Sequence, residues 1–178
     1  MEPLTLDVRV VTAGSVDTAE LADVAAQTFP LACPPATAAA DIASFVETNL
    51  SAERFAEYLA DPRRAILTAT RDGRILGYAM VIRDAGDDAA ELSKIYVLPD
   101  QHGTGASAAL MDLAVATAQQ WGVRRLWLGV NQANQRAQRF YRKHGFEVSG
   151  TRTFRVGAGL ENDYVMVREL GSAPPAAT

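Results

Sequence analysis

Two glycines, Gly103 and Gly105, occupy a short loop between a stretch that predicts a strand and a stretch of helical apolar periodicity that runs to Trp121. Glycine allows the backbone to come close to a bound ligand. The first turn of a helix offers backbone N–H groups that have no partner inside the helix, together with the positive end of the helix dipole. This arrangement favours the binding of a phosphate or a diphosphate.

Other interpretations of the loop meet specific objections. A nucleotide-binding loop of the Walker type requires a lysine directly after its second glycine, and none follows Gly105. The stretch from Gly103 to Ala108 fits the dinucleotide fingerprint G-x-G-x-x-A, but the next strand ends at Asn131 without a carboxylate for a ribose hydroxyl. Too few residues then remain for the second half of that fold. When this segment is considered alone, a loop that serves only as a turn is also a possible interpretation.

The elements that must position the loop follow from periodicity and turn signals. The expected helices cover residues 15–28, capped by Ser15, then 36–50, 51–59, 106–121 and 134–144, with a break at Pro30. The expected strands cover residues 4–11, 65–70, 75–82, 91–97, 125–130, 146–154 and 163–169. Asp72-Gly73 is a strong signal for a two-residue hairpin. We expect a mixed α/β sheet in a single domain over residues 1–170, followed by a disordered tail over 171–178.

The composition limits what this domain can do. The chain has 178 residues, of which 48% are hydrophobic and 21% charged, as in a soluble globular protein. Its net charge of -4 disfavours nucleic-acid binding, because that affinity comes from cations that neutralise phosphates. Cys33 is the only cysteine, which excludes an intrachain disulfide and a cysteine metal cluster. The sequence shows no signal-peptide pattern and no membrane-spanning apolar run, so we expect a cytoplasmic protein without a membrane partner.

Two motifs in a fixed order carry a family resemblance. The first is the loop His102-Gly-Thr-Gly105-Ala-Ser107, after a strand that ends Ile95-Tyr-Val-Leu-Pro99. The second follows the next strand and reads Asn134-x-x-Ala137-x-x-Phe140-Tyr141-x-Lys143-x-Gly145-Phe146. Over residues 5–170 the chain resembles the GNAT superfamily of acetyl-CoA-dependent N-acetyltransferases, whose loop has the pattern R/Q-x-x-G-x-G/A. His102 and Ser107 depart from this pattern in their side chains, but their backbone N–H groups remain.

Shorter segments resemble one branch of this superfamily. Residues 28–29, 91–99, 126–130 and 163–167 look like the bacterial spermidine/spermine N-acetyltransferases. The implied fold is a mixed, mostly antiparallel central sheet of about seven strands flanked by helices. The sheet is expected to splay between the strand at 91–97 and the strand at 125–130.

The resemblance also implies which residues hold the acetyl donor, acetyl-CoA, and it implies no metal. The diphosphate is expected on backbone N–H groups of His102, Gly103, Thr104, Gly105, Ala106 and Ser107. Residues Ile95, Tyr96 and Val97 are expected to pair their backbone with the pantetheine amides, much as an added strand would. Asn134 either meets the pantetheine or phosphate region or only caps its helix. Lys143 either touches the ribose phosphate or only complements the helix dipole.

Two residues are candidates for the proton transfers of such a reaction. By resemblance, Tyr141 returns a proton to the departing CoA thiolate, although it could instead only pack with Phe140. By resemblance, Glu91 is the general base, and burial would raise its pKa toward a useful value; the alternative is a solvated residue at a sheet edge. Simple alternation puts Glu91, Ser93, Ile95 and Val97 on one face of the strand and Leu92, Lys94 and Tyr96 on the other.

The resemblance implies acetyl transfer to a small primary amine, with a polyamine as the first guess. We expect direct attack by the amine, because Cys33 lies among prolines without a histidine nearby in sequence. Two alternatives stay open: a non-catalytic acyl-CoA-binding domain of the same fold, and acetylation of a protein or peptide amine. The acceptor is expected between the loop after Phe29, the helices up to Leu59 and the hairpin over 151–163. Many members of the superfamily dimerise, so the resemblance is compatible with a homodimer.

Overall fold

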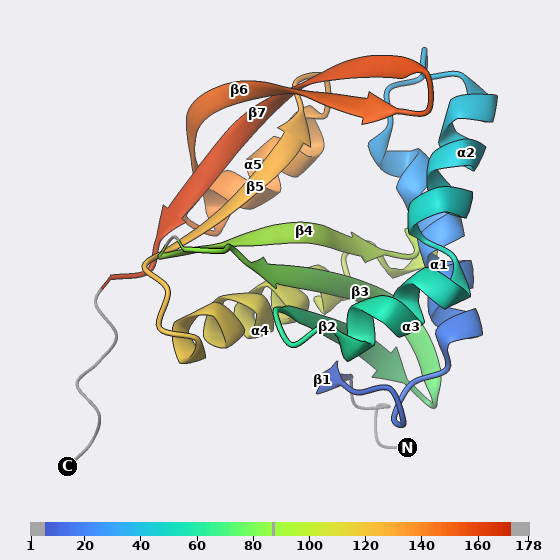
Figure 1. Ribbon diagram of the computed structural model, residues 1–178, viewed down its shortest axis with the longest axis vertical. Helices are drawn as coiled ribbons and strands as arrows, with labels where there is room; N and C mark the ends of the chain where they lie inside the picture. Colours follow the sequence, from blue (N-terminus) through green and yellow to red (C-terminus); the bar gives the residue numbers. More distant parts are fainter. Residues whose placement is uncertain (1–5, 87, 172–178) are drawn as a thin grey trace.

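One sheet runs through the described part of the molecule. The computed structural model describes residues 6–86 and 88–171, so the predicted tail, except for residue 171, lies outside the described residues. Within those ranges the sheet has seven strands in the order β1-β2-β3-β4-β5-β7-β6 (Figure 1). The strands are β1 (Asp7–Val11), β2 (Arg64–Arg71), β3 (Arg74–Arg83), β4 (Ala89–Val97), β5 (Arg125–Asn131), β6 (Glu147–Val156) and β7 (Gly159–Glu169). Only β4 and β5 are parallel, which confirms the predicted mixed, mostly antiparallel sheet.

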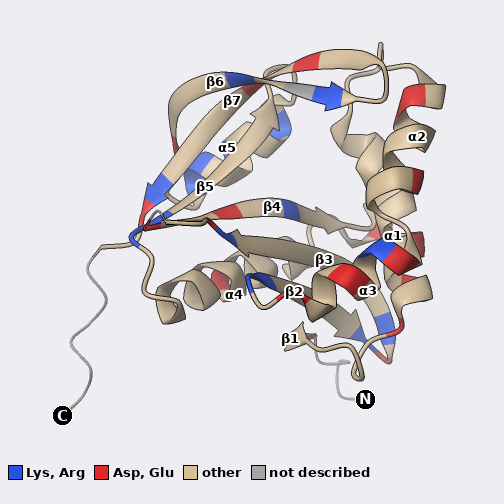
Figure 2. Cartoon of the chain, in the orientation of Figure 1, with Lys and Arg blue, Asp and Glu red and all other residues tan. Residues whose placement is uncertain are grey.

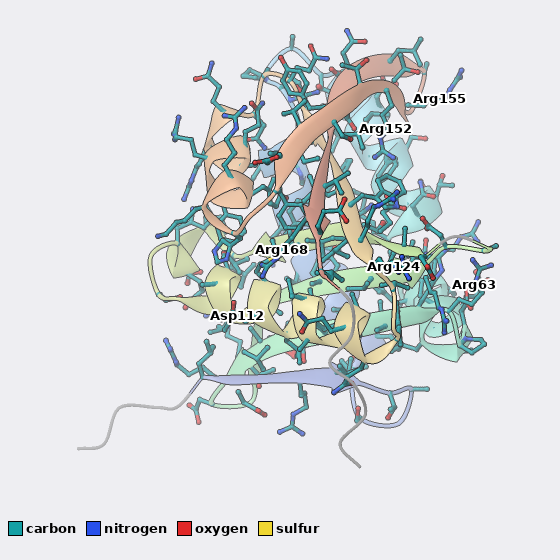
Figure 3. All side chains as sticks on the ribbon, turned by 90° about the vertical axis from the view of Figure 1, so that its left-hand side faces the viewer. Arg63, Asp112, Arg124, Arg152, Arg155 and Arg168 are labelled. Carbon is teal, nitrogen blue, oxygen red and sulfur yellow. The ribbon has the colours of Figure 1, made fainter. Side chains whose placement is uncertain are left out.

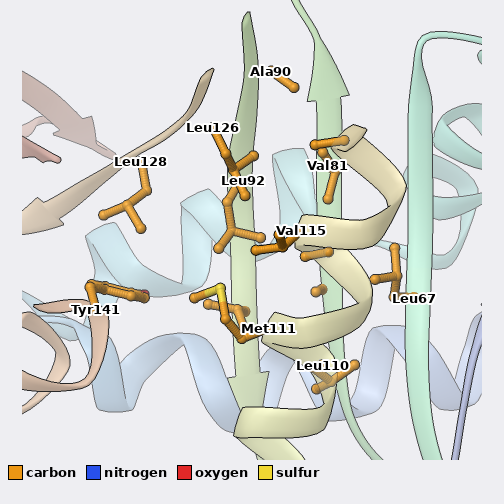
Figure 4. Packing of buried hydrophobic residues seen from close by; sticks show 14 of the residues in the cluster. Leu67, Val81, Ala90, Leu92, Leu110, Met111, Val115, Leu126, Leu128 and Tyr141 are labelled. Carbon is orange, nitrogen blue, oxygen red and sulfur yellow. The ribbon is translucent and has the colours of Figure 1, made fainter. Parts of the chain in front are cut away.

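Helices cover both faces of this sheet. They are α1 (Thr18–Ala32), α2 (Ala39–Asn49), α3 (Ala52–Ala60), α4 (Ala106–Gln120) and α5 (Gln135–Lys143), with a short 3-10 helix at Pro99–Gln101. Helix α4 packs on β2, β3 and β4, and Tyr141 of α5 joins the same buried cluster near Met111 (Figure 4). On the opposite face α1 and α3 pack on β3 and β2, while α2 contacts β6. No helix in the described ranges has the length and apolar character needed to cross a membrane.

The first hairpin forms where the sequence predicts it. Asp72 and Gly73 connect β2 and β3, and their φ angles of 53° and 75° are both left-handed. A type I′ turn requires this conformation at both central positions, and aspartate followed by glycine is one of the pairs that adopt it most readily. The turn fixes the register of β2 against β3, which in turn aligns the rest of the antiparallel half of the sheet.

The first helix begins and ends later than predicted. Asp17, rather than Ser15, is its N-cap, and the Asp17 carboxylate accepts hydrogen bonds from two backbone N–H groups of the first turn. Ser15 instead accepts a hydrogen bond of 2.8 Å from the backbone N–H of Thr12, within the preceding turn. At the other end Pro30 lies inside the helix, which continues to Ala32. The longer helix carries the residues before the proline-rich loop to the cavity described below.

A bulge in β4 changes which side chains share a face. In the register with β3, Ser93 has no partner, and this extra residue shifts the alternation of side chains by one position. The face toward α1, α2 and α3 carries Glu91, Lys94 and Tyr96, and the face toward α4 carries Leu92, Ile95 and Val97. The predicted alternation was therefore wrong, since Glu91 does not share a face with Ile95 and Val97.

Strands β4 and β5 diverge soon after they meet. Their parallel pairing covers only Ala89–Glu91 against Arg125–Trp127. Beyond Glu91 the two strands separate, as Figure 1 shows, and the predicted splay is confirmed. The later residues of β4 therefore have no partner strand on the β5 side within the described ranges.

Candidate active site

A cavity of about 790 Å³ lies where β4 and β5 diverge. Its walls come from the end of α1, from β4, from the loop and first turn of α4, from the end of β5, from α5 and from the β6–β7 hairpin. We name the part lined by residues 101–108 and α5 the loop end. The charged end is the part lined by Glu91, Lys94, Arg152, Glu161 and Asp163. Figure 2 shows acidic and basic segments on β4, β6 and β7 beside the divergence.

Most of the predicted site residues line this cavity. These are Glu91, Ile95, Tyr96, Val97, His102, Gly103, Gly105, Ser107, Asn134 and Tyr141. Thr104, Ala106 and Lys143 do not line it. The Thr104 hydroxyl donates to the Gln101 carbonyl at 2.7 Å, the Ala106 side chain is buried under the sheet, and Lys143 is exposed at the end of α5. For Thr104 and Ala106 only the backbone is available to a ligand, and Lys143 stands where it complements the helix dipole.

The loop end presents backbone N–H groups that lack an acceptor. Gly103 and Gly105 have left-handed φ angles of 86° and 89°, a conformation that glycine adopts without strain. Among the described residues, no acceptor is found for the N–H groups of Gly103, Gly105, Ala106, Ser107 and Ala108. The N–H of His102 donates to Pro99 at 3.4 Å and that of Thr104 to Gln101 at 3.3 Å. The free donors therefore start at Gly103 and continue into the first turn of α4.

Helix α5 brings a phenol to the same cavity. Tyr141 is only 9% exposed, and its ring packs edge-on against Phe140 and Phe146, with centroids 5.6 Å and 6.0 Å away. Packing and access to the cavity are therefore both observed for this residue. Burial raises the pKa of Tyr141, so the phenol keeps its proton across the neutral range and can donate it.

The start of α5 carries two polar side chains toward the cavity. Asn134 is the N-cap, and its Oδ1 accepts a hydrogen bond of 3.1 Å from the N–H of Ala137. The cap uses the carbonyl oxygen and leaves the amide N–H₂ of Asn134 for a ligand, so the two predicted roles are compatible. Arg136, which the sequence reasoning did not select, also lines the cavity, and the pKa of His102 is lowered first by burial and then by the charge of Arg136. It supplies a cation beside the free N–H groups.

At the charged end, Glu91 is a partly buried carboxylate whose ion-pair partner is Arg152. Burial raises the pKa of Glu91, and the nearby guanidinium of Arg152 partly opposes this rise. Arg152 Nη1 lies 3.9 Å from Glu91 Oε2, and Arg152 Nε lies 3.4 Å from Asp163 Oδ2. Asp163 is itself buried, and burial raises its pKa as well. Glu91 is therefore a stronger base than an exposed glutamate and still faces the cavity.

Lys94 is a second cation at the charged end. Its Nζ donates to the Ser93 carbonyl at 3.1 Å and lies 5.8 Å from the centre of the Phe45 ring. Burial lowers the pKa of Lys94 to about 8, because the ammonium loses hydration that these contacts do not fully replace. Lys94 is thus mostly charged at pH 7 and becomes neutral at mildly alkaline pH.

Glu161 completes the charged end from β7. Its carboxylate accepts hydrogen bonds from the Thr37 hydroxyl at 3.0 Å and from the Asn131 amide at 3.4 Å. Within the described ranges no Lys or Arg side chain lies within ion-pair distance of it. Cys33 lies close by, and burial together with the Glu161 charge raises the thiol pKa to about 11. The thiol stays protonated at neutral pH, which makes Cys33 a poor nucleophile.

The residues that sequence reasoning missed are concentrated at the charged end. Lys94 was placed on the face opposite Glu91, because the bulge at Ser93 has no local signal in the sequence. Arg152 and Asp163 are direct cross-strand partners in the β6–β7 hairpin, and Glu161 follows the same alternation. Opposite charges on paired strands indicate an ion pair once the register is known. The sequence of either strand alone does not determine that register.

The geometry suits an extended ligand with a phosphorylated end. The loop end offers backbone donors to a diphosphate, and the unpaired part of β4 can pair with an extended amide chain. Tyr141 adds a phenol and Glu91 a partly buried carboxylate to the walls of the same cavity. Among the described residues no group of three His, Cys, Asp or Glu side chains could hold a metal ion.

Solved structures of N-acetyltransferases share this fold, and one of them contains coenzyme A. The fold matches the PaiA N-acetyltransferase from Thermoplasma acidophilum in complex with coenzyme A, with a TM-score of 0.79, 19% identity and coverage of 93% of this chain and 99% of that one. It also matches the ribosomal-protein-S18-alanine N-acetyltransferase from Escherichia coli, with a TM-score of 0.71, 20% identity and coverage of 98% and 99%. At these identities the likeness shows the fold.

Sequence relatives identify the family. An uncharacterized N-acetyltransferase of Mycobacterium tuberculosis is 71% identical over 155 residues, which cover 86% of this chain and 98% of that protein. The mycothiol acetyltransferase of Propionibacterium freudenreichii is 30% identical over 101 residues, which cover 55% of this chain and 32% of that protein. The model of the acetyltransferase (GNAT) family matches residues 27–146. The chain therefore belongs to the GNAT family and is an acetyl-CoA-dependent N-acetyltransferase.

Proposed function

We propose that the protein acetylates a small primary amine, with a polyamine as the first acceptor to test, by direct attack of the amine on the thioester of acetyl-CoA. The observation that carries this proposal is one cavity that joins free backbone N–H groups to a partly buried carboxylate and a buried phenol. The resemblance of several short segments to spermidine/spermine N-acetyltransferases supports the choice of the first acceptor.

Each residue has a defined task in this reaction. When the amine nitrogen bonds to the thioester carbon, the bond from that carbon to sulfur breaks, and the amine loses a proton. Glu91 accepts this proton, because its raised pKa makes it a stronger base than an ordinary glutamate. Tyr141, which stays protonated, donates its phenolic proton to the thiolate. Transfer of a proton from Glu91 through solvent to Tyr141 restores both groups.

The charged end supports a cationic acceptor. Arg152 pairs with Glu91 and Asp163, whereas Glu161 faces the same cavity with hydrogen-bond donors but no ion-pair partner among the described residues. A carboxylate in that position suits the second ammonium of a diamine. The protonated thiol of Cys33 supports direct attack rather than an acyl-enzyme.

The test follows CoA release from acetyl-CoA with a panel of acceptors. The panel contains an α,ω-diamine, the monoamine of the same chain length and a peptide with a free alanine amino terminus. We expect turnover with the diamine to exceed turnover with the matched monoamine. Turnover with the peptide alone would instead favour a protein acceptor, and coenzyme A binding without turnover on any amine would favour a non-catalytic acyl-CoA-binding domain.

A second measurement tests direct attack. Cys33→Ala should keep full turnover, and mass spectrometry of the enzyme with acetyl-CoA alone should show no acetyl group on Cys33. Ping-pong kinetics with a trapped acyl-enzyme that disappears in Cys33→Ala would contradict direct attack.

A further inference from the structure

Arg152 reaches from one half of the splayed sheet to the other. Arg152 stands on β6 (Figure 3), opposite Asp163 on β7. Its guanidinium lies 5.5 Å from the centre of the Trp127 ring on β5. From there Nη1 lies 3.9 Å from Glu91 on β4. The side chain therefore crosses β7 and β5 to reach β4.

A glycine on β5 makes room for this crossing. A Cβ atom placed on Gly129 would lie 2.6 Å from both Cζ and Nε of Arg152, which no real contact allows. Any larger residue at this position would push the guanidinium out of its place between the strands. The lack of a side chain at Gly129 thus leaves the space that the guanidinium of Arg152 occupies.

The ion pair of Arg152 with Glu91 lies where backbone pairing between the two halves of the sheet ends. Glu91 opposite Trp127 is the last parallel pair of β4 and β5. Past this point, in the described chain, the ion pair of Arg152 with Glu91 connects the two halves through side chains. Arg152 holds a carboxylate from each half, and a guanidinium with several fixed donors suits this double role better than an ammonium does.

We propose that Arg152 is a positioning residue for Glu91, holding its carboxylate ionised and in a fixed place at the cavity wall. Other charges also act on Glu91: Lys94 from its own strand, Asp84 from the turn after β3 and Arg64 from β2. Among these, Arg152 is the one within ion-pair distance of Glu91. The role of Glu91 as general base rests on the function proposed above, whereas the coupling of Arg152 to Glu91 can be measured in the protein alone.

The direct test is an NMR titration of the Glu91 side-chain carboxyl carbon in the ligand-free protein, assigned through Glu91→Gln. Arg152→Gln should raise the measured pKa of Glu91 by about 1 or more, because a charge at this distance is removed. Arg155→Gln, an exposed arginine three positions along the same strand, is the matched control and should leave that pKa unchanged. An unchanged Glu91 pKa in folded Arg152→Gln protein would overturn the proposal.

Gly129→Ala keeps both charges and displaces the guanidinium, so it tests position rather than charge. It should move the Glu91 pKa upward as well, and an unchanged value would show that the fit of Arg152 over Gly129 has no effect on Glu91. Far-UV circular dichroism confirms that each variant is folded, so the titration remains interpretable if Arg152→Gln loses some stability.

A kinetic readout separates this proposal from the proposed function. If Glu91 is the base, the acid limb of kcat/KM moves to higher pH in Arg152→Gln by the same amount as the NMR pKa, and stays in place in Arg155→Gln. A shifted NMR pKa with an unmoved acid limb would support the coupling and contradict the role of Glu91 as base. An unshifted NMR pKa would contradict the coupling, whatever the kinetics.

Discussion

The two ends of the cavity are built in different ways. The loop end comes from one contiguous segment, residues 101–108, and from α5, and its ligand-facing donors are mostly backbone N–H groups. The charged end draws its side chains from β4, β6 and β7, with Thr37 and Asn131 in support from the α1–α2 connection and β5. One end therefore depends on backbone conformation, and the other on the identity of single side chains.

Because of this difference, departures from the family pattern at the loop end are expected to have little effect on cofactor binding. His102 and Ser107 differ from the usual residues in their side chains, but every residue except proline supplies a backbone N–H. The charged end has no such tolerance, because each carboxylate or cation changes the pKa of its neighbours.

Tyr141→Phe tests the one side chain beside the loop end that we expect to be indispensable. Without the phenolic proton, kcat should fall about 100-fold, a typical contribution of a general acid. The Kd for coenzyme A should stay nearly unchanged, because the ring and its packing against Phe140 and Phe146 are kept. Steady-state kinetics and calorimetry measure the two quantities. Unchanged kcat would remove Tyr141 from the mechanism.

Gly77→Ala tests whether the loop end depends on backbone position. A Cβ at Gly77 would lie 2.7 Å from the carbonyl oxygen of Tyr96 and 2.6 Å from Val97 Cγ1, so the end of β4 must shift. We expect the free energy of unfolding to fall by about 2 kcal/mol, as for an overpacked core, and coenzyme A binding to weaken. Urea denaturation and calorimetry check both effects. Wild-type affinity in a destabilised variant would show that the exact position of β4 is unimportant.

Glu161→Gln tests whether the charged end selects a second ammonium. We expect KM for an α,ω-diamine to rise about tenfold, equivalent to roughly 1.4 kcal/mol, with KM for the matched monoamine unchanged. The control is Glu147→Gln, which alters an exposed glutamate on β6 outside the cavity. Equal changes for both amines would mean that Glu161 supports the fold of the site rather than its selectivity.

Lys94→Met tests whether the charged end lowers stability. The folded-state pKa of Lys94, about 8, lies below its ordinary value of 10.5, so charging it opposes folding. This penalty is fully present below about pH 8 and disappears above about pH 10.5. Lys94→Met should therefore raise the free energy of unfolding by about 1 kcal/mol at pH 7. Urea denaturation at pH 7 and pH 10 gives the comparison, and an advantage that does not shrink at the higher pH would contradict this origin.

Sequence reasoning succeeded where a short segment determines its own structure. The Asp72-Gly73 turn needs two left-handed residues in a row, and few sequences other than this type supply them. The segment from Gly103 to Ser107 likewise contains both its glycines and its helix start. The splay between β4 and β5 was predicted only through the family resemblance.

Sequence reasoning failed where the local structure depends on pairing with a distant part of the chain. The bulge at Ser93 is a property of the β3–β4 register, so alternation along β4 alone placed Lys94 on the face opposite Glu91. The cap of α1 was assigned to Ser15, whereas Asp17, two residues later, offers the same capping chemistry and is the observed cap. Arg152 and Asp163 become a pair only once β6 and β7 are aligned. The residues of the charged end could therefore not be predicted to lie together, because the strand registers that bring them together were not known from the sequence.

The central claim, that backbone N–H groups at the start of α4 hold the cofactor, has a direct test at Ser107. Its N–H has no acceptor among the described residues, so Ser107→Pro removes a free donor at a position in the first helical turn where proline is tolerated. Ser107→Ala removes only the hydroxyl. Calorimetry should give a Kd for coenzyme A at least about tenfold weaker for Ser107→Pro, since a hydrogen bond to a charged group is lost, and an unchanged Kd for Ser107→Ala. Equal affinity in the two variants would contradict the claim.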